Sequence, residues 1–306
     1  MVRRKGPSSL LPPPVPVSPN VLAGIGYVVL MTACFATLDA SAKYASLALP
    51  LLTVIWGRYL FNFVFVAGWF AAARPGQLPR TSRPVLQVVR SLLMVGATVT
   101  FWSALRYLDL ATAVAIGFAA PLLVTALSVP VLGEKVGLHR WAAVVTGFIG
   151  VMVVVRPGGA EFEWAALLPL ATALFYAGYQ ITTRLLAATD DGMTTLVFTA
   201  AGGLVAASFL VPFGWQMLEP VDWLVVAWLG FLGAVGHYFL IQAFARAPAS
   251  VIAPFTYLTI VWAAVLGYLI FGDVPTSNTV VGATIIVAAG LYVLHRENRA
   301  RRVATS

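Results

Sequence analysis

Five ionisable side chains lie inside long apolar stretches of the sequence: Asp39, Lys43, Arg58, Arg90 and His237. A charged group in apolar surroundings is costly, so each of these residues needs a partner, water or a ligand. Asp39 and Lys43 are four residues apart, which places them on one face of a helix and allows them to pair with each other. We therefore expect an Asp39–Lys43 ion pair near a helix end.

Arg58 is the strongest candidate for binding a ligand. At about 1.5 Å of rise per residue, it lies roughly 12 Å inside its apolar stretch, close to mid-depth. Its guanidinium keeps its charge and needs a carboxylate, a carbonyl or water. A ligand carboxylate and the Asp39 side chain meet this need equally well. Arg90 is only about two helical turns from the end of its stretch, so its side chain is expected to extend to the aqueous boundary.

Further candidates are a histidine, a tyrosine–glutamine pair and a set of aromatic rings. We expect His237 to be buried and bonded to a backbone carbonyl; the alternative is a role in proton coupling, because histidine titrates near neutral pH. Tyr179 and Gln180 are expected to contact a ligand, since an amide that faces lipid stays unsatisfied. Five deep aromatic residues are expected either to line a cavity or to pack between helices: Trp102, Phe118, Tyr176, Tyr257 and Trp262.

Two prolines, Pro121 and Pro254, interrupt apolar stretches. Proline lacks the amide hydrogen that a helix uses, and it tends to kink the helix. In a membrane such breaks are tolerated where helices bend around a cavity. We therefore expect helix kinks at both positions.

The elements that must position these residues are membrane helices. Hydrophobic residues make up 60% of the 306 residues and charged residues 10%, whereas a soluble domain has about a quarter charged residues. The net charge of +8 forms no continuous basic face, which argues against nucleic acid as a partner. A helix needs roughly 20 apolar residues to cross a membrane. Ten stretches reach this length: 21–45, 50–73, 85–105, 110–132, 137–155, 163–187, 194–215, 222–245, 249–271 and 278–295.

Basic residues predict the orientation, because cytoplasmic loops are rich in Lys and Arg. With a cytoplasmic N-terminus, the loop cations that face outward are few: Lys43, Arg106 and Arg156. Four acidic loop residues then face outward as well: Glu161, Glu163, Glu219 and Asp222. We predict a multi-pass protein of the bacterial inner membrane with both termini in the cytoplasm, where residues 1–20 form a disordered tail and residues 297–306 a basic one.

The sequence contains an internal repeat. Segments 104–150 and 243–290 share a polar turn, an Ala-rich span, a glycine followed by an acid, and a Gly-rich final span. Residues of the two halves correspond as follows: Glu134 with Asp273 at a spacing of 139, and Asp39 with Gln180 and Lys43 with Arg184 at a spacing of 141. Each copy holds five spans, and an odd number inverts the second copy in the membrane. We predict repeats at 21–157 and 158–296, an arrangement that recurs in transporters.

Two stretches of the chain resemble drug/metabolite transporters with EamA domains. Residues 104–157 are similar to the signature half of one domain and read ALRYLDLATAVAIGFAAPLLVTALSVPVLGEKVGLHRWAAVVTGFIGVMVVVRP. Residues 257–275 are similar to the matching part of the second domain and read YLTIVWAAVLGYLIFGDVP. The resemblance covers nearly the whole chain after residue 20. It implies ten helices in an inverted 5+5 repeat around a central cavity and transport by alternating access.

An interior rich in aromatic rings and poor in charge is typical of a site for small hydrophobic zwitterions. Together with the resemblance to bacterial amino-acid and metabolite exporters, this favours export of aromatic or other apolar amino acids, with Arg58 holding the carboxylate. The alternative is a carrier of a larger metabolite such as S-adenosylmethionine, or a drug exporter. Asp39 and Lys43 would belong to an outer gate, and the scarcity of deep carboxylates favours facilitated diffusion over proton coupling.

Two other classes of membrane protein are less consistent with the sequence. An enzyme is not expected, because no HExxH, Gly-Xaa-Ser-Gly or Walker motif occurs. A scaffold without transport has no need of an inverted repeat. We expect no catalytic residue, metal or cofactor, and as partners a small-molecule substrate and lipid. The Gly-rich faces allow either a monomer or a weak homodimer.

Overall fold

The computed structural model describes residues 20–134, 136–157 and 164–305. Within them every regular element is a helix, and ten helices are long and apolar enough to cross a membrane, as the sequence predicts. The predicted N-terminal tail lies outside the described residues, apart from Asn20, and so do Glu161 and Glu163. The segment expected to form a basic C-terminal tail continues the last helix to Thr305.

Each half of the chain contributes five spans, and the fourth span of each half is broken. The first half contains α1 (Val21–Ala45), α2 (Leu51–Ala73), α3 (Pro84–Ala104), the broken span α4 (Leu110–Gly117) and α5 (Ala120–Leu132), and α6 (Leu138–Val155). The second half contains η1 (Trp164–Ala166) with α7 (Leu167–Leu186), α8 (Gly192–Leu210) with η2 (Val211–Gly214), α9 (Pro220–Arg246), the broken span α10 (Ala249–Thr256), α11 (Leu258–Leu266) and η3 (Gly267–Phe271), and α12 (Ser277–Thr305).

The two broken spans share their local structure. The break between α4 and α5 begins at Phe118, three residues before Pro121, and the break between α10 and α11 lies at Tyr257, three residues after Pro254. Pro121 lacks the N–H that would bond to the carbonyl oxygen of Gly117, which explains the break before it. Pro254 lies inside α10, and its missing bond falls on its N-terminal side, so it does not account for the break at Tyr257. Each broken span then ends at a glycine in the left-handed conformation, which favours this residue: Gly133 (φ 68°) and Gly272 (φ 71°).

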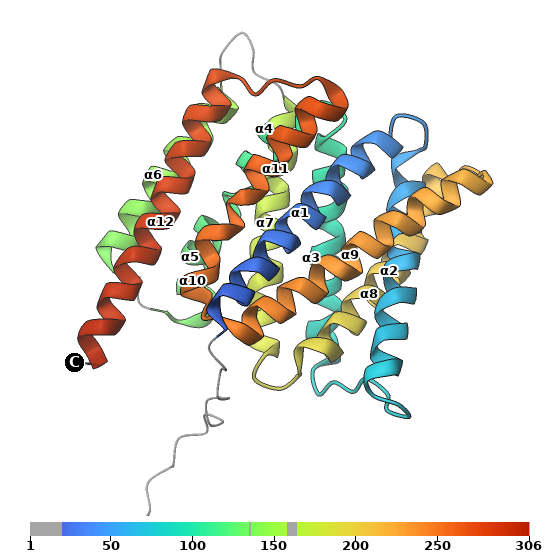
Figure 1. The fold of residues 1–306 in the computed structure, drawn as a ribbon, viewed down its shortest axis with the longest axis horizontal. Helices are drawn as coiled ribbons and strands as arrows, with labels where there is room; N and C mark the ends of the chain where they lie inside the picture. Colours follow the sequence, from blue (N-terminus) through green and yellow to red (C-terminus); the bar gives the residue numbers. More distant parts are fainter. Residues whose placement is uncertain (1–19, 135, 158–163, 306) are drawn as a thin grey trace, which may run out of the picture.

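Helix packing repeats between the two halves, as an inverted repeat requires. α1 packs along α9 as α7 packs along α3, and α2 packs against α9 as α8 packs against α3. α1 contacts α10 and α11, just as α7 contacts α4 and α5. Equivalent spans also meet directly: α2 with α8, α4 with α11, and α6 with α12, which lie side by side at one edge of the bundle (Figure 1). The halves are therefore interleaved, and neither buries its helices alone.

The two ends of the helical bundle lie on one side of it. α1 starts and α12 ends on the same side (Figure 1), because an even number of spans returns the chain to its starting face. We call this side the terminal face and the opposite side the far face. Its assignment to the cytoplasm stays a prediction from the basic residues.

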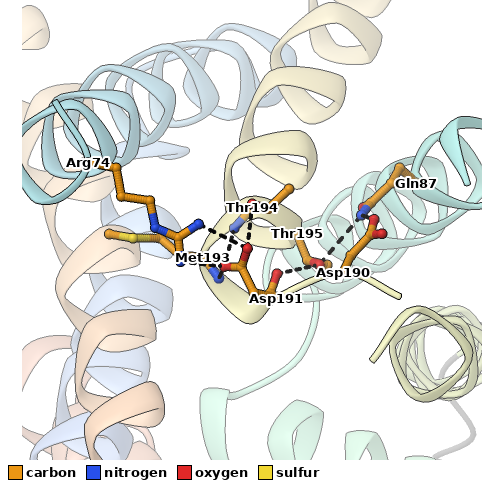
Figure 2. Close-up of polar contacts among 7 residues, drawn as sticks. All are labelled: Arg74, Gln87, Asp190, Asp191, Met193, Thr194 and Thr195. Carbon is orange, nitrogen blue, oxygen red and sulfur yellow. Dashed lines mark hydrogen bonds and ion pairs between the residues drawn. The ribbon is translucent and has the colours of Figure 1, made fainter. Parts of the chain in front are cut away.

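The loop between α7 and α8 joins three helices at the terminal face (Figure 2). Asp191 caps α8 by accepting a bond from the Thr194 amide, and it pairs with both terminal nitrogens of Arg74 after α2, at 3.0 and 3.1 Å. Its neighbour Asp190 accepts a bond from Gln87 Nε2 of α3 at 2.7 Å. Burial raises the pKa of Asp191, but hydrogen bonds from Arg74 and Thr194 outweigh this effect and lower the pKa to about 2.

The crossing of α6 and α12 allows a test of the packing. A Cβ atom on Gly282 would lie 2.6 Å from the carbonyl oxygen of Gly150, a backbone atom that cannot rotate away. We expect Gly282→Ala to destabilise the protein by about 1–3 kcal/mol, the usual cost of overpacking. Thermal unfolding in detergent measures this effect. Gly26→Ala is the matched control, because a Cβ there meets no atom within 4 Å; an equal Tm for both variants would contradict the packing.

Asp191 provides a second test, with a defined pH dependence. The pKa of Asp191 lies below the unfolded value of 3.8, so its ion pair stabilises the protein fully above about pH 4 and loses this effect as the pH falls towards about 2. Asp191→Asn keeps a capping oxygen without the charge, whereas Asp191→Ala removes both. We expect a Tm difference between wild type and Asp191→Asn at pH 6 that shrinks below pH 4. We expect Asp191→Ala to cost about 1 kcal/mol more than Asp191→Asn; equal losses would mean that the cap contributes nothing.

Candidate functional site

Arg58 is a buried cation without a full set of partners. Its side chain on α2 is 5% exposed. Nη1 donates to Thr98 Oγ1 of α3 at 3.3 Å, and the guanidinium lies over the rings of Tyr59 and Trp102, at 4.7 and 5.3 Å from their centroids. Nε has no acceptor, and no carboxylate of the described residues lies within 4 Å of the guanidinium. Burial of an N–H without an acceptor is costly, so this group is poised for an added acceptor.

Trp102 links Arg58 to Asp39. The indole Nε1 of Trp102 donates to Asp39 Oδ1 of α1 at 3.0 Å, while the face of the same ring lies beside the guanidinium. A positive and a negative group are therefore placed near one aromatic ring, without an ion pair between them. We call Arg58, Trp102 and Asp39 the charged triad. The triad draws on α1, α2 and α3, all from the first half of the chain.

The expected Asp39–Lys43 pair does not form, and this prediction was wrong. Lys43 Nζ instead binds Asp273 Oδ2 at 2.8 Å and the carbonyl oxygen of Leu108 at 3.2 Å, and it lies 4.7 Å from the centre of the Phe271 ring. The i,i+4 spacing permits a pair on one helix, but Lys43 lies at the helix end, where other elements offer three groups together. The alternative pairing of Asp39 with Arg58 is not formed at ion-pair distance either.

The prediction for Arg90 was also wrong, because its side chain does not extend to the aqueous boundary. Its side chain is 5% exposed. It donates to Tyr179 Oη at 2.6 Å, to Thr183 Oγ1 at 2.7 Å and to the Thr195 carbonyl oxygen at 3.2 Å, and it also contacts Thr199. α7 and α8 thus supply enough acceptors to keep the charge inside the bundle. Arg90 joins α3 to both helices, and each of its three side-chain nitrogens has an acceptor.

Tyr176 and Tyr179 form a second aromatic group beside Arg90. Their rings are stacked, with centroids 5.5 Å apart and 17° between the planes. Tyr179 is buried, but Tyr176 is 39% exposed although it lies in the middle of α7. Gln180, one residue further, is partly exposed, and its side chain makes no hydrogen bond to a described residue. This section of α7 therefore offers an open ring face and an amide.

The remaining predicted residues connect helices. The Phe118 and Tyr257 rings meet at the two helix breaks, with centroids 5.0 Å apart. Trp262 Nε1 donates to Thr32 Oγ1 at 3.2 Å and so joins α11 to α1. His237 Nδ1 lies 2.8 Å from the Gly233 carbonyl oxygen one turn earlier, the contact expected for a buried histidine. Together these contacts hold the bundle and do not place the predicted residues around one point.

The pocket on the far face does not include the charged triad. It measures about 630 Å³ and lies between the α1–α2 turn, the end of α3 and the region of η2. Ser103 and Arg106 line it, whereas the neighbouring Trp102 does not. A central cavity around the predicted site residues stays a prediction.

Sequence reasoning missed Thr98 and Asp273 as polar partners. Threonine is common in membrane helices, so nothing marks Thr98 before the helices are placed. Asp273 did carry a signal, because the repeat pairs it with Glu134, but both acids were read only as marks of a span end. The recurrence of an acid directly after the glycine could have identified both as ion-pair partners.

Comparison with known proteins agrees with this architecture. The sequence model described as "EamA-like transporter family" matches residues 22–156 and 163–294. A solved crystal structure superimposes with a TM-score of 0.63 over 92% of this chain and 98% of its own chain. Its sequence identity is 19%, so it shows a shared fold.

Characterised relatives align along nearly their whole length. The S-adenosylmethionine uptake transporter of Rickettsia prowazekii is 28% identical over 91% of this chain and 94% of its own. The riboflavin transporter of Vibrio cholerae is 28% identical over 92% of this chain and 96% of its own. The pseudopaline exporter CntI of Pseudomonas aeruginosa is 25% identical over 87% and 94%. These relatives are named as transporters and not enzymes. The family model matches both halves of this chain, whose described residues contain ten helices able to cross a membrane, and the chain belongs to the EamA-like transporter family.

Proposed function

We propose that this protein carries S-adenosylmethionine, or a metabolite of the same class, across a bacterial inner membrane. This class joins an amino-acid zwitterion to an aromatic heterocycle. The observation that carries the proposal is the charged triad, in which Arg58 has a buried N–H without an acceptor and Asp39 accepts a bond from the Trp102 indole. The names of several relatives, which are S-adenosylmethionine uptake transporters, support the same class.

The triad is complementary to a zwitterion. The substrate carboxylate would accept from Arg58, and charge-assisted bonds of this kind are stronger than neutral ones. The substrate ammonium would bind Asp39, whose side chain is only partly buried. Binding would then neutralise both protein charges at once, which lowers the cost of holding them in a membrane.

We propose that the rest of such a substrate would bind at the aromatic section of α7. A sulfonium cation is attracted to the face of an aromatic ring, as other cations are. The stacked Tyr176 and Tyr179 offer a ring face, and the Gln180 amide is free to hydrogen-bond a heterocycle. Asp39 and Arg58 would recognise one end of the molecule and α7 the other.

Export of aromatic amino acids, the first expectation from the sequence, is now the weaker alternative. An amino acid would use the same triad, but the names of the relatives favour a larger cargo. Riboflavin is the second candidate. It lacks an amino-acid zwitterion, so it would depend on the Tyr176 face and would leave the triad without a role.

A competition experiment in proteoliposomes tests the substrate class. We expect uptake of labelled S-adenosylmethionine without an imposed pH gradient, because the proposed carrier facilitates diffusion. Unlabelled S-adenosylmethionine should compete best, S-adenosylhomocysteine less well because it lacks the sulfonium charge, phenylalanine weakly, and riboflavin and a cationic dye not at all. Uptake of riboflavin together with absent uptake of S-adenosylmethionine would replace the proposal with the second candidate.

Substitutions in the triad test its role. Arg58→Gln and Asp39→Asn each remove one charge, and we expect each to lower the affinity about tenfold or more, as for the loss of a charged hydrogen bond. Arg58→Lys should also lower the affinity, although it keeps the charge, because an ammonium cannot reproduce the Nε–H geometry of the guanidinium. Arg80→Gln, the same change at an exposed loop arginine, is the control. Folded Arg58→Gln protein with unchanged KM would exclude the triad from binding.

A further inference from the structure

Two ion pairs join the halves of the chain, one at each face. Lys43 at the end of α1 binds Asp273, which follows η3, with 2.8 Å between Nζ and Oδ2. Arg184 in the last turn of α7 binds Glu134, which follows α5, with 2.9 Å between Nη2 and Oε1. The first pair lies at the far face and the second at the terminal face. In each pair, one residue belongs to the first half of the chain and the other to the second half.

These two ion pairs are equivalent under the internal repeat. Lys43 and Arg184 correspond at a spacing of 141 residues, and Glu134 and Asp273 correspond at 139. Each acid directly follows a left-handed glycine that ends the fourth span of its half. Each cation lies at the end of the first span of its half. The inversion of the repeat is what places the two equivalent pairs on opposite faces.

We infer that the two ion pairs are latches that open in turn during transport. In an inverted repeat, the conformation of one half at one face is taken up by the other half at the opposite face when access alternates. A contact that closes the far face must then have an equivalent that closes the terminal face. Lys43–Asp273 holds α1 against η3, and Arg184–Glu134 holds α7 against α5. Both latches are closed in this structure.

The two latches differ in their surroundings. Lys43 is 14% and Asp273 28% exposed, and the lysine also binds the Leu108 carbonyl oxygen and the Phe271 ring. Arg184 is 52% and Glu134 35% exposed. An exposed ion pair is weaker and is screened by salt. The terminal-face latch therefore opens more readily, and high salt should increase opening at that face first.

Distances between spin labels test the latches without any substrate. The protein carries Cys34→Ser and is reconstituted in lipid nanodiscs. One label pair at the exposed positions Leu47 and Val274 reports the far face, and another at Leu138 and Ala188 reports the terminal face. Pulsed electron resonance then measures both distances. This readout does not depend on the cargo, so failure of the latch proposal and failure of the S-adenosylmethionine proposal are distinguishable.

Breaking one latch should open one face. We expect Asp273→Asn to lengthen the far-face distance and Glu134→Gln to lengthen the terminal-face distance, each leaving the other face closed. Asp191→Asn is the matched control, because it breaks a terminal-face ion pair that has no charged equivalent in the repeat. It should change neither distance.

A charge swap separates a latch from a general loss of stability. Lys43→Asp combined with Asp273→Lys restores opposite charges, and we expect the far-face distance to return to that of the wild type. Unchanged distances in both single variants would overturn the inference. So would lengthening of the same distance by both variants, or a far face that stays open in the swap.

Discussion

A guanidinium inside a membrane keeps its charge and must be satisfied by the protein, by water or by a ligand. This chain places two such groups inside its spans and treats them differently. Around Arg90, α7 and α8 supply a phenol, hydroxyls and a carbonyl. The guanidinium therefore links α3 to α7 and α8 through hydrogen bonds. Around Arg58 the bundle supplies one hydroxyl and two ring faces, and the buried Nε–H stays without an acceptor. α3 contributes to both environments, which makes it the centre of the polar interior.

Much of the fold could be predicted because hydrocarbon restricts what a chain can do. Only helices satisfy the backbone within a single span, so apolar stretches of sufficient length identify all ten spans. Span ends are local too, and the glycine–acid pairs at Gly133 and Gly272 are readable without a structure. The repeat then relates the contacts of one half to those of the other: because α1 and α7 are equivalent, as are α9 and α3, packing of α1 on α9 implies packing of α7 on α3. What the sequence does not contain is the exact depth or rotation of each helix.

The errors at the site arise from that missing rotation. Lys43 was paired with Asp39 because helical spacing is the only geometry available within one span. Its actual partner, Asp273, lies 230 residues away and becomes a neighbour only when α1 packs against α11. Arg90 was placed at the boundary from its depth alone. A long side chain extends to water only where nothing nearer accepts its bonds, and here α7 and α8 provide nearer acceptors. Trp102 as a bridge between two charges was likewise beyond the reach of a single sequence.

The repeat also explains why the ion pairs and the proposed substrate site differ in symmetry. A carrier with alternating access must close both faces, and equivalent halves solve this problem with equivalent contacts, as Lys43–Asp273 and Arg184–Glu134 do. Substrate binding imposes no such symmetry, because a molecule with two unlike ends binds at a single site and needs a different partner at each end. Accordingly Asp39 corresponds to Gln180, so the charge appears in one half only and its equivalent is a neutral amide. Symmetry is retained where the two access states must be alike, and it is lost where an asymmetric molecule would bind.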